Sequence, residues 1–277
     1  MPSKSGKNNQ PAPDGAKVIA EVLKASAPRP ERSDPVGEKN QYAVRFADHM
    51  ATRIAADLSE RLGDIEATTK RNAGSVRGKK QLDINFSTPQ LGLALGISLK
   101  SVHLRDVKGA ERYTHNMKRN EEELRIEASG YHKRQPYAVM IGVLFLPFDS
   151  ADDGKKDNPS SFGSWVRHLR PYAGRDEPTD EIDRFEKIYI ALYEPSGTDL
   201  RFFDVQKDPP KNGRPAELLA YGEFLDAVYR EYLWRNEADF KWAEGEEEPL
   251  EVEEFPSDDD EETFRARAPS HAGDASA

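Results

Sequence analysis

The stretch of residues 137–146, YAVMIGVLFL, constrains the fold of this chain more than any other feature of the sequence. It is almost wholly apolar, rich in β-branched and aromatic side chains, and bounded by Pro136 and Pro147. A short apolar run of this kind is typical of a strand buried on both faces, which requires helices on both sides of the sheet. We therefore expect an α/β fold with a mixed central sheet flanked by helices.

Hydrophobic periodicity predicts the elements around this strand. Phe46, Met50, Ile54 and Leu58 recur at intervals of four residues and indicate a helix over residues 41–65. Two β-like runs around a Glu-Pro-Ser-Gly turn indicate a hairpin. The other expected helices cover residues 111–134, 160–169 and 216–234, and the strands of the hairpin cover residues 185–193 and 200–205.

The two ends of the chain differ in composition from its middle. Residues 1–39 are rich in proline, serine, lysine and glycine, and we expect a disordered arm with one or two helical turns near residues 18–23. Residues 237–277 hold 15 acids and three bases, and their mutual repulsion predicts a disordered acidic tail. The folded domain is expected over residues 40–236.

Composition also bears on charge and compartment. The tail accounts for the formal net charge of −10, because residues 1–236 hold 37 bases and 35 acids. The absence of cysteine excludes disulfides and thiolate metal sites and is typical of a cytoplasmic protein. No run of about 18 apolar residues is present and the N-terminus lacks an apolar signal region, so we expect no membrane partner.

The segment of residues 81–101, QLDINFSTPQLGLALGISLKS, carries the strongest chemical signal. Asp83 lies in a β-like run, and a second apolar run leads to Lys100, with turn-forming residues between the two runs. Two strands joined by a short connection would bring both side chains to one end of a sheet. A carboxylate and an ammonium group placed there can bind a divalent metal and steady a phosphate.

This segment resembles the PD-(D/E)XK nuclease family, the fold of most restriction endonucleases. That family places an aspartate on one strand and a [D/E]-x-K triplet on the next. Asp83 matches the first acid, Lys100 matches the lysine, and Ser98 stands where the second acid is expected. The resemblance covers roughly residues 41–236, and residues 116–148 resemble the helix and central strand that follow the active-site hairpin. It implies a restriction-endonuclease-like sheet.

The resemblance implies a Mg²⁺-dependent DNA endonuclease of the restriction or defence type, with Asp83, Ser98 and Lys100 as catalytic residues. Asp83 and the backbone carbonyl of Leu99 would hold the metal, and Lys100 would orient or help to deprotonate the attacking water. Because serine is a weak metal ligand, Glu60 or Glu66, in or just after the preceding helix, is a candidate for the missing carboxylate. The implied partners are double-stranded DNA, a second copy in a homodimer and a partner methyltransferase.

A basic segment lies directly upstream of Asp83. Residues 70–80, KRNAGSVRGKK, contain five bases and no acid, which is the charge that a DNA backbone attracts. The candidate DNA-binding residues are Lys70, Arg71, Arg77, Lys79, Lys80 and, in a later helix, Arg119.

Two alternatives remain open from the sequence. The stretch that begins at Gln90 and ends at Val102 has the glycine spacing of a helix-turn-helix, with a recognition helix starting near Ser98. That alternative predicts a DNA-binding regulator without catalysis, although Pro89, Gly92 and Gly96 weaken a helix here. The second alternative is a nuclease-like fold that has lost its metal site and serves as a binding module. The serine at position 98 is its main support.

Overall fold

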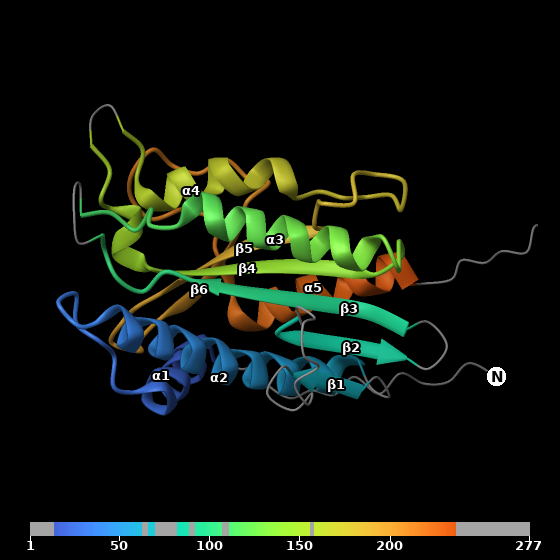
Figure 1. Ribbon diagram of the computed structural model, residues 1–277, viewed down its shortest axis with the longest axis horizontal. Helices are drawn as coiled ribbons and strands as arrows, with labels where there is room; N and C mark the ends of the chain where they lie inside the picture. Colours follow the sequence, from blue (N-terminus) through green and yellow to red (C-terminus); the bar gives the residue numbers. More distant parts are fainter. Residues whose placement is uncertain are drawn as a thin grey trace, which may run out of the picture. The chain divides into compact units, whose positions relative to one another are not determined.

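The computed structural model describes residues 14–62, 66–69, 82–88, 92–106, 111–155 and 158–236. Within these residues the chain forms an α/β fold with one open sheet of seven strands and five α-helices (Figure 1). The helices are α1 Gly15–Ser26, α2 Val36–Leu62, α3 Met117–His132, α4 Ser161–Leu169 and α5 Tyr221–Asn236, with 3-10 turns at Phe148–Ala151 and Arg170–Tyr172. The strands are β1 Glu66–Thr69, β2 Ile84–Thr88, β3 Gly92–Ser101, β4 Val139–Pro147, β5 Lys187–Tyr193, β6 Leu200–Asp204 and β7 Leu219–Ala220.

The sheet is mixed, and its spatial order follows the sequence from β1 to β7. The central strands β3, β4 and β5 run parallel to one another. The pair β1 and β2 continues the sheet antiparallel beside β3, and β6 and β7 continue it antiparallel beside β5. Parallel neighbours need a crossover connection, and α3 lies in the connection from β3 to β4 and α4 in the one from β4 to β5. The mixed, helix-flanked sheet is confirmed.

The core has two layers, one on each face of the sheet. Because β4 lies between them, it is buried along its whole length. Val139, Ile141 and Val143 face the cluster that also contains the apolar sides of α1, α2 and α5. Met140 and Leu144 point the other way, into the cluster that contains the apolar sides of α3 and α4. This alternation follows the two-residue period of a strand, and Figure 1 shows the two sets of helices on opposite faces of the sheet.

The structure corrects the expectation of a disordered arm over residues 1–39. Residues 15–26 form the helix α1, which is capped by Asp14, whose side chain accepts a hydrogen bond from the backbone N–H of Ala16. Val18 and Ile19 are fully buried in the core. The short apolar patch is therefore one face of an amphipathic helix, which packs on α2 and β6. Residues 1–13 and the acidic tail at 237–277 lie outside the described residues.

The helix-turn-helix alternative is also wrong about local structure, because residues 92–101 form the strand β3. Gly96, the proposed turn glycine, lies inside this strand. A Cβ atom at this position would come within 2.4 Å of Leu82 Cδ1 and 2.9 Å of Met140 Sδ. The glycine is explained by this close approach of side chains and not by a turn. None of the described helices is long and apolar enough to cross a membrane.

Candidate active site

Ser98 and Lys100 are two positions apart in β3, so the pleat points both side chains to the same face of the sheet, toward α3. Leu99, between them, points to the opposite face and joins the core beneath α2. The sequence Ser-Leu-Lys therefore anchors the strand with its leucine and presents a hydroxyl and an ammonium group to α3.

A carboxylate from α3 meets both polar groups. Lys100 Nζ donates to Glu127 Oε1 at 2.9 Å, and the Ser98 hydroxyl donates to Glu127 Oε2. Glu127 is 8% exposed, and Lys100 is 14% exposed. Glu123, one helical turn earlier, places its Oε2 3.5 Å from Lys100 Nζ. The lysine thus lies between β3 and a pair of glutamates on one face of α3.

Asp83 reaches the same place from the other strand of the hairpin. It immediately precedes β2, which pairs antiparallel with β3. Its Oδ2 accepts a hydrogen bond of 2.7 Å from the backbone N–H of Leu99. That bond fixes the Asp83 carboxylate beside the strand segment that carries Ser98 and Lys100. The structure therefore brings together Asp83, Ser98, the Leu99 backbone and Lys100.

The electrostatics of the cluster keep Lys100 charged. Burial by itself lowers the pKa of the Lys100 ammonium, because a charge is less stable away from water. The charge and hydrogen bond of Glu127, with the charges of Asp83 and Glu123, act in the opposite direction and exceed that effect, so the net pKa is raised. At neutral pH, Lys100 is a fixed positive charge between carboxylates.

Other candidate residues are not brought to this cluster. Glu60 is exposed on α2, on the opposite face of the sheet from α3 (Figure 1). Glu66 begins β1, and its side chain is not described. Arg119 is 72% exposed on α3 and forms an ion pair of 2.9 Å with Glu123. The basic candidates Lys70, Arg71, Arg77, Lys79 and Lys80 lie outside the described residues.

The sequence alone does not identify Glu123 and Glu127. It offers Glu60 and Glu66, before the hairpin, for the missing carboxylate, whereas the carboxylates beside Lys100 come from the crossover helix after the hairpin. A usable signal was present: Leu124 and Ala128 mark the buried side of this helix, and Glu127 lies next to that side. Because α3 must cross back over the sheet between β3 and β4, its buried face meets the residues of β3 that point toward it.

The residues present agree with the ligand chemistry of Mg²⁺. That ion prefers hard oxygen ligands and is commonly held by one or two carboxylates together with substrate phosphates and water. Asp83 and Glu127 are two such carboxylates. No group of three or more histidines, aspartates or glutamates arranged to hold a metal occurs among the described residues, so a metal here would depend on two protein carboxylates and on the phosphate.

Comparisons of the chain with protein-family models, curated proteins and solved structures give no match. The relation to the PD-(D/E)XK nucleases therefore stays a resemblance carried by Asp83, Ser98 and Lys100. In the structure, Glu127 is bonded to Ser98 and Lys100, and Asp83 is bonded to the Leu99 N–H between them.

Proposed function

We propose that the chain is a Mg²⁺-dependent DNA endonuclease of the PD-(D/E)XK type. The observation that carries the proposal is that two carboxylates from separate elements are bonded to one segment of β3, Asp83 to the Leu99 N–H and Glu127 to Lys100. A lysine and two acids at the end of a strand pair can bind a divalent metal and a phosphate, which metal-dependent phosphodiester hydrolysis uses.

The order of elements supports the proposal. The resemblance implies an active-site hairpin followed by a helix and a central strand, and the chain has β2 and β3, then α3, then β4. β4 lies parallel to β3 and is buried throughout. This arrangement is what brings Glu127 over Ser98 and Lys100.

Glu127 supplies the carboxylate that the serine at position 98 lacks. In the proposed site, Asp83 and Glu127 would hold Mg²⁺, which would polarise the phosphate and lower the pKa of a bound water. The Ser98 hydroxyl orients the Glu127 carboxylate by donating to Oε2. The Leu99 N–H does the same for Asp83. Each acid is thus held in place by β3.

Lys100 acts as a positive charge and not as a base, because its pKa is raised and it stays protonated at neutral pH. Its ammonium would bind a phosphate oxygen and stabilise the negative charge that develops during hydrolysis. Double-stranded DNA is the proposed substrate, attracted by the basic segment at residues 70–80. The homodimer, the partner methyltransferase and the cytoplasmic location stay predictions.

The test is cleavage of unmethylated plasmid and bacteriophage DNA with Mg²⁺ and with EDTA. We expect discrete fragments only with Mg²⁺, and none from Lys100→Ala or Asp83→Ala. The matched control is Lys118→Ala, which removes an exposed lysine of α3 whose one ion pair among the described residues is with Glu122, at 3.8 Å. Cleavage by Lys100→Ala at the wild-type rate would refute the assignment.

One observation favours a second candidate, a nuclease-like module without catalysis. Both oxygens of Glu127 are engaged, one by Ser98 and one by Lys100. A metal would have to compete with these bonds. This candidate predicts that the protein binds DNA but neither binds Mg²⁺ at Glu127 nor cleaves any of the substrates.

A further inference from the structure

A pocket of about 350 Å³ lies between α5 and the strands β5 to β7, on the face of the sheet opposite to Lys100 and α3. This volume is within the range of small-ligand sites. Three acidic and three basic side chains line it, so its lining carries no net charge.

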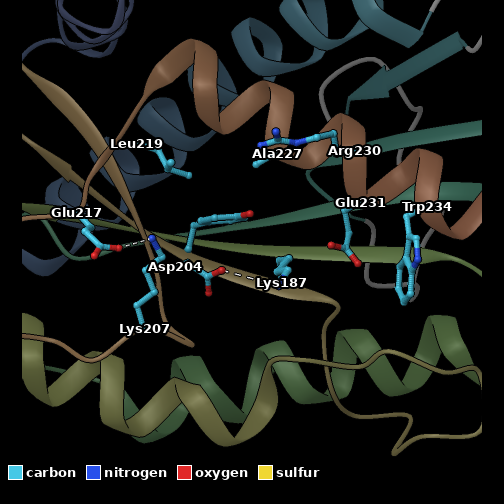
Figure 2. Close-up of a pocket in the computed structure, with 10 residues that line it drawn as sticks. Lys187, Asp204, Lys207, Glu217, Leu219, Ala227, Arg230, Glu231 and Trp234 are labelled. Carbon is cyan, nitrogen blue, oxygen red and sulfur yellow. Dashed lines mark hydrogen bonds and ion pairs between the residues drawn. The ribbon is translucent and has the colours of Figure 1, made fainter.

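The charges on the strand side of the pocket are paired with one another. Lys207 Nζ lies 2.7 Å from Glu217, and Lys187 Nζ lies 3.8 Å from Asp204 (Figure 2). Lys187 also donates to Gln206 at 2.7 Å. These groups need no ligand to satisfy them. The part of the pocket that can recognise a ligand is therefore the side formed by α5.

On that side, Figure 2 shows Arg230, Glu231 and Trp234 of α5. The side chains of Arg230 and Glu231 form no hydrogen bond or ion pair with any described residue. Glu231 is half-buried, and this burial raises the pKa of its carboxyl in spite of the opposing charge of Lys187. A half-buried carboxylate without donors is costly for the folded protein. A ligand with N–H groups would remove that cost.

Trp234 is exposed but held in place. Its side chain is 59% accessible, and the guanidinium of Arg235 lies 5.5 Å from its ring centroid. Arg235 is itself fixed, because its side chain is only 6% exposed and donates to the carbonyl of Arg175 at 3.0 Å. An exposed indole on a fixed support is a surface on which a planar ring can stack, as bases stack on aromatic side chains in nucleic-acid-binding proteins.

From these features we propose that the pocket binds a guanine nucleotide, with the base stacked on Trp234, its N–H edge on Glu231 and its phosphate on Arg230. Guanine is the base whose Watson–Crick edge presents two adjacent donors, N1–H and the N2 amino group, to the two acceptor oxygens of a carboxylate. Adenine, cytosine and uracil each place an acceptor beside their donor. The arginine offers several N–H donors to a phosphate.

The inference does not rest on the proposed nuclease activity. The pocket and the cluster around Lys100 lie on opposite faces of the sheet and share no residue. Either assignment can fail while the other stands.

The test is isothermal titration of the full chain with guanosine monophosphate and adenosine monophosphate in the absence of Mg²⁺. We expect the guanine nucleotide to bind at least about tenfold more tightly, because a hydrogen bond to a charged group is strong when both partners are desolvated. Glu231→Gln should reduce this preference to nearly none. Glu122→Gln, which removes an exposed acid on α3, should leave it unchanged.

Two further variants separate the parts of the site. Trp234→Ala should weaken the binding of both nucleotides. Arg230→Ala should lower the affinity for guanosine monophosphate to that for guanosine, which has no phosphate. Melting curves check that each variant is folded, which we expect because no described residue forms a hydrogen bond or ion pair with the side chain of Glu231 or Arg230. Equal affinity for the two nucleotides, no heat of binding at millimolar concentration, or a preference that survives in Glu231→Gln would overturn the proposal.

Discussion

Lys100 of β3 and Glu127 of α3, 27 residues apart in the chain, form an ion pair of 2.9 Å in which both side chains are largely buried. Ser98 donates to the other oxygen of the same carboxylate. This relationship joins β3 to the crossover helix α3, and both the predicted stability and the proposed chemistry of the site depend on it.

The first prediction concerns the stability of this pair. Lys100→Met should lower the free energy of unfolding by about 2–3 kcal/mol, because it leaves Glu127 charged and buried beside Glu123. The double variant Lys100→Met, Glu127→Leu should recover much of that loss, because it removes both charges. Urea denaturation of the wild type, both single variants and the double variant measures the coupling. If the double variant loses as much free energy of unfolding as the two single variants together, the ion pair contributes nothing to stability.

The second prediction concerns pH. His103 is buried against Tyr42 and Phe46, and burial, with a smaller effect from the charge of Arg29, lowers its pKa from 6.5 to about 3. The unfolded chain therefore takes up this proton at a higher pH than the folded chain. The free energy of unfolding should fall as the pH drops from 6.5 toward 3. Above pH 6.5, neutral His103 should make its full contribution to the free energy of unfolding.

Denaturation of the wild type and of His103→Gln at several pH values across this window tests the effect. The variant should lose less stability than the wild type on acidification, since it has no proton to take up. His115→Gln is the matched control, because His115 is 68% exposed. If the two variants show the same dependence on pH, the buried imidazole is not the cause.

The third prediction concerns Gly96. Gly96→Ala should destabilise the fold by about 1–2 kcal/mol, because the new Cβ forces Leu82 and Met140 to move within a packed core. Gly130→Ala on α3 is the matched control, since a Cβ there meets nothing within 4 Å. The control should stabilise by about 0.5–1 kcal/mol through helix propensity. Thermal melting compares the two substitutions, and equal effects would contradict the packing described around Gly96.

The fourth prediction concerns α1. Ile19→Ala should cost about 2–4 kcal/mol, because the side chain is fully buried in the main core. Lys17→Ala, on the exposed side of the same helix, should change the stability by less than about 0.5 kcal/mol. Urea denaturation measures both. A disordered segment would show no difference between the two variants.

Local patterns were sufficient for the central strand at residues 137–146 and for the hairpin that carries Asp83 and Lys100. They were not sufficient for α1, because a short amphipathic helix in a polar, proline-rich stretch is stabilised by its contacts with α2 and β6 and not by its own composition. They also missed Glu127. Which of the glutamates of α3 meets Lys100 depends on how the crossover helix is rotated over the sheet, and that is a tertiary property.

The measurement that tests the central claim most directly is cleavage of supercoiled plasmid by the wild type, Glu127→Gln and Glu122→Gln in matched Mg²⁺. Glutamine at position 127 keeps the size of the side chain and an acceptor for Ser98, but it removes the charge that would hold a metal. Glu122 is exposed on the same helix and pairs only with Lys118 among the described residues. The account predicts that Glu127→Gln loses cleavage by at least about a hundredfold while Glu122→Gln matches the wild type. Wild-type cleavage by Glu127→Gln would contradict it.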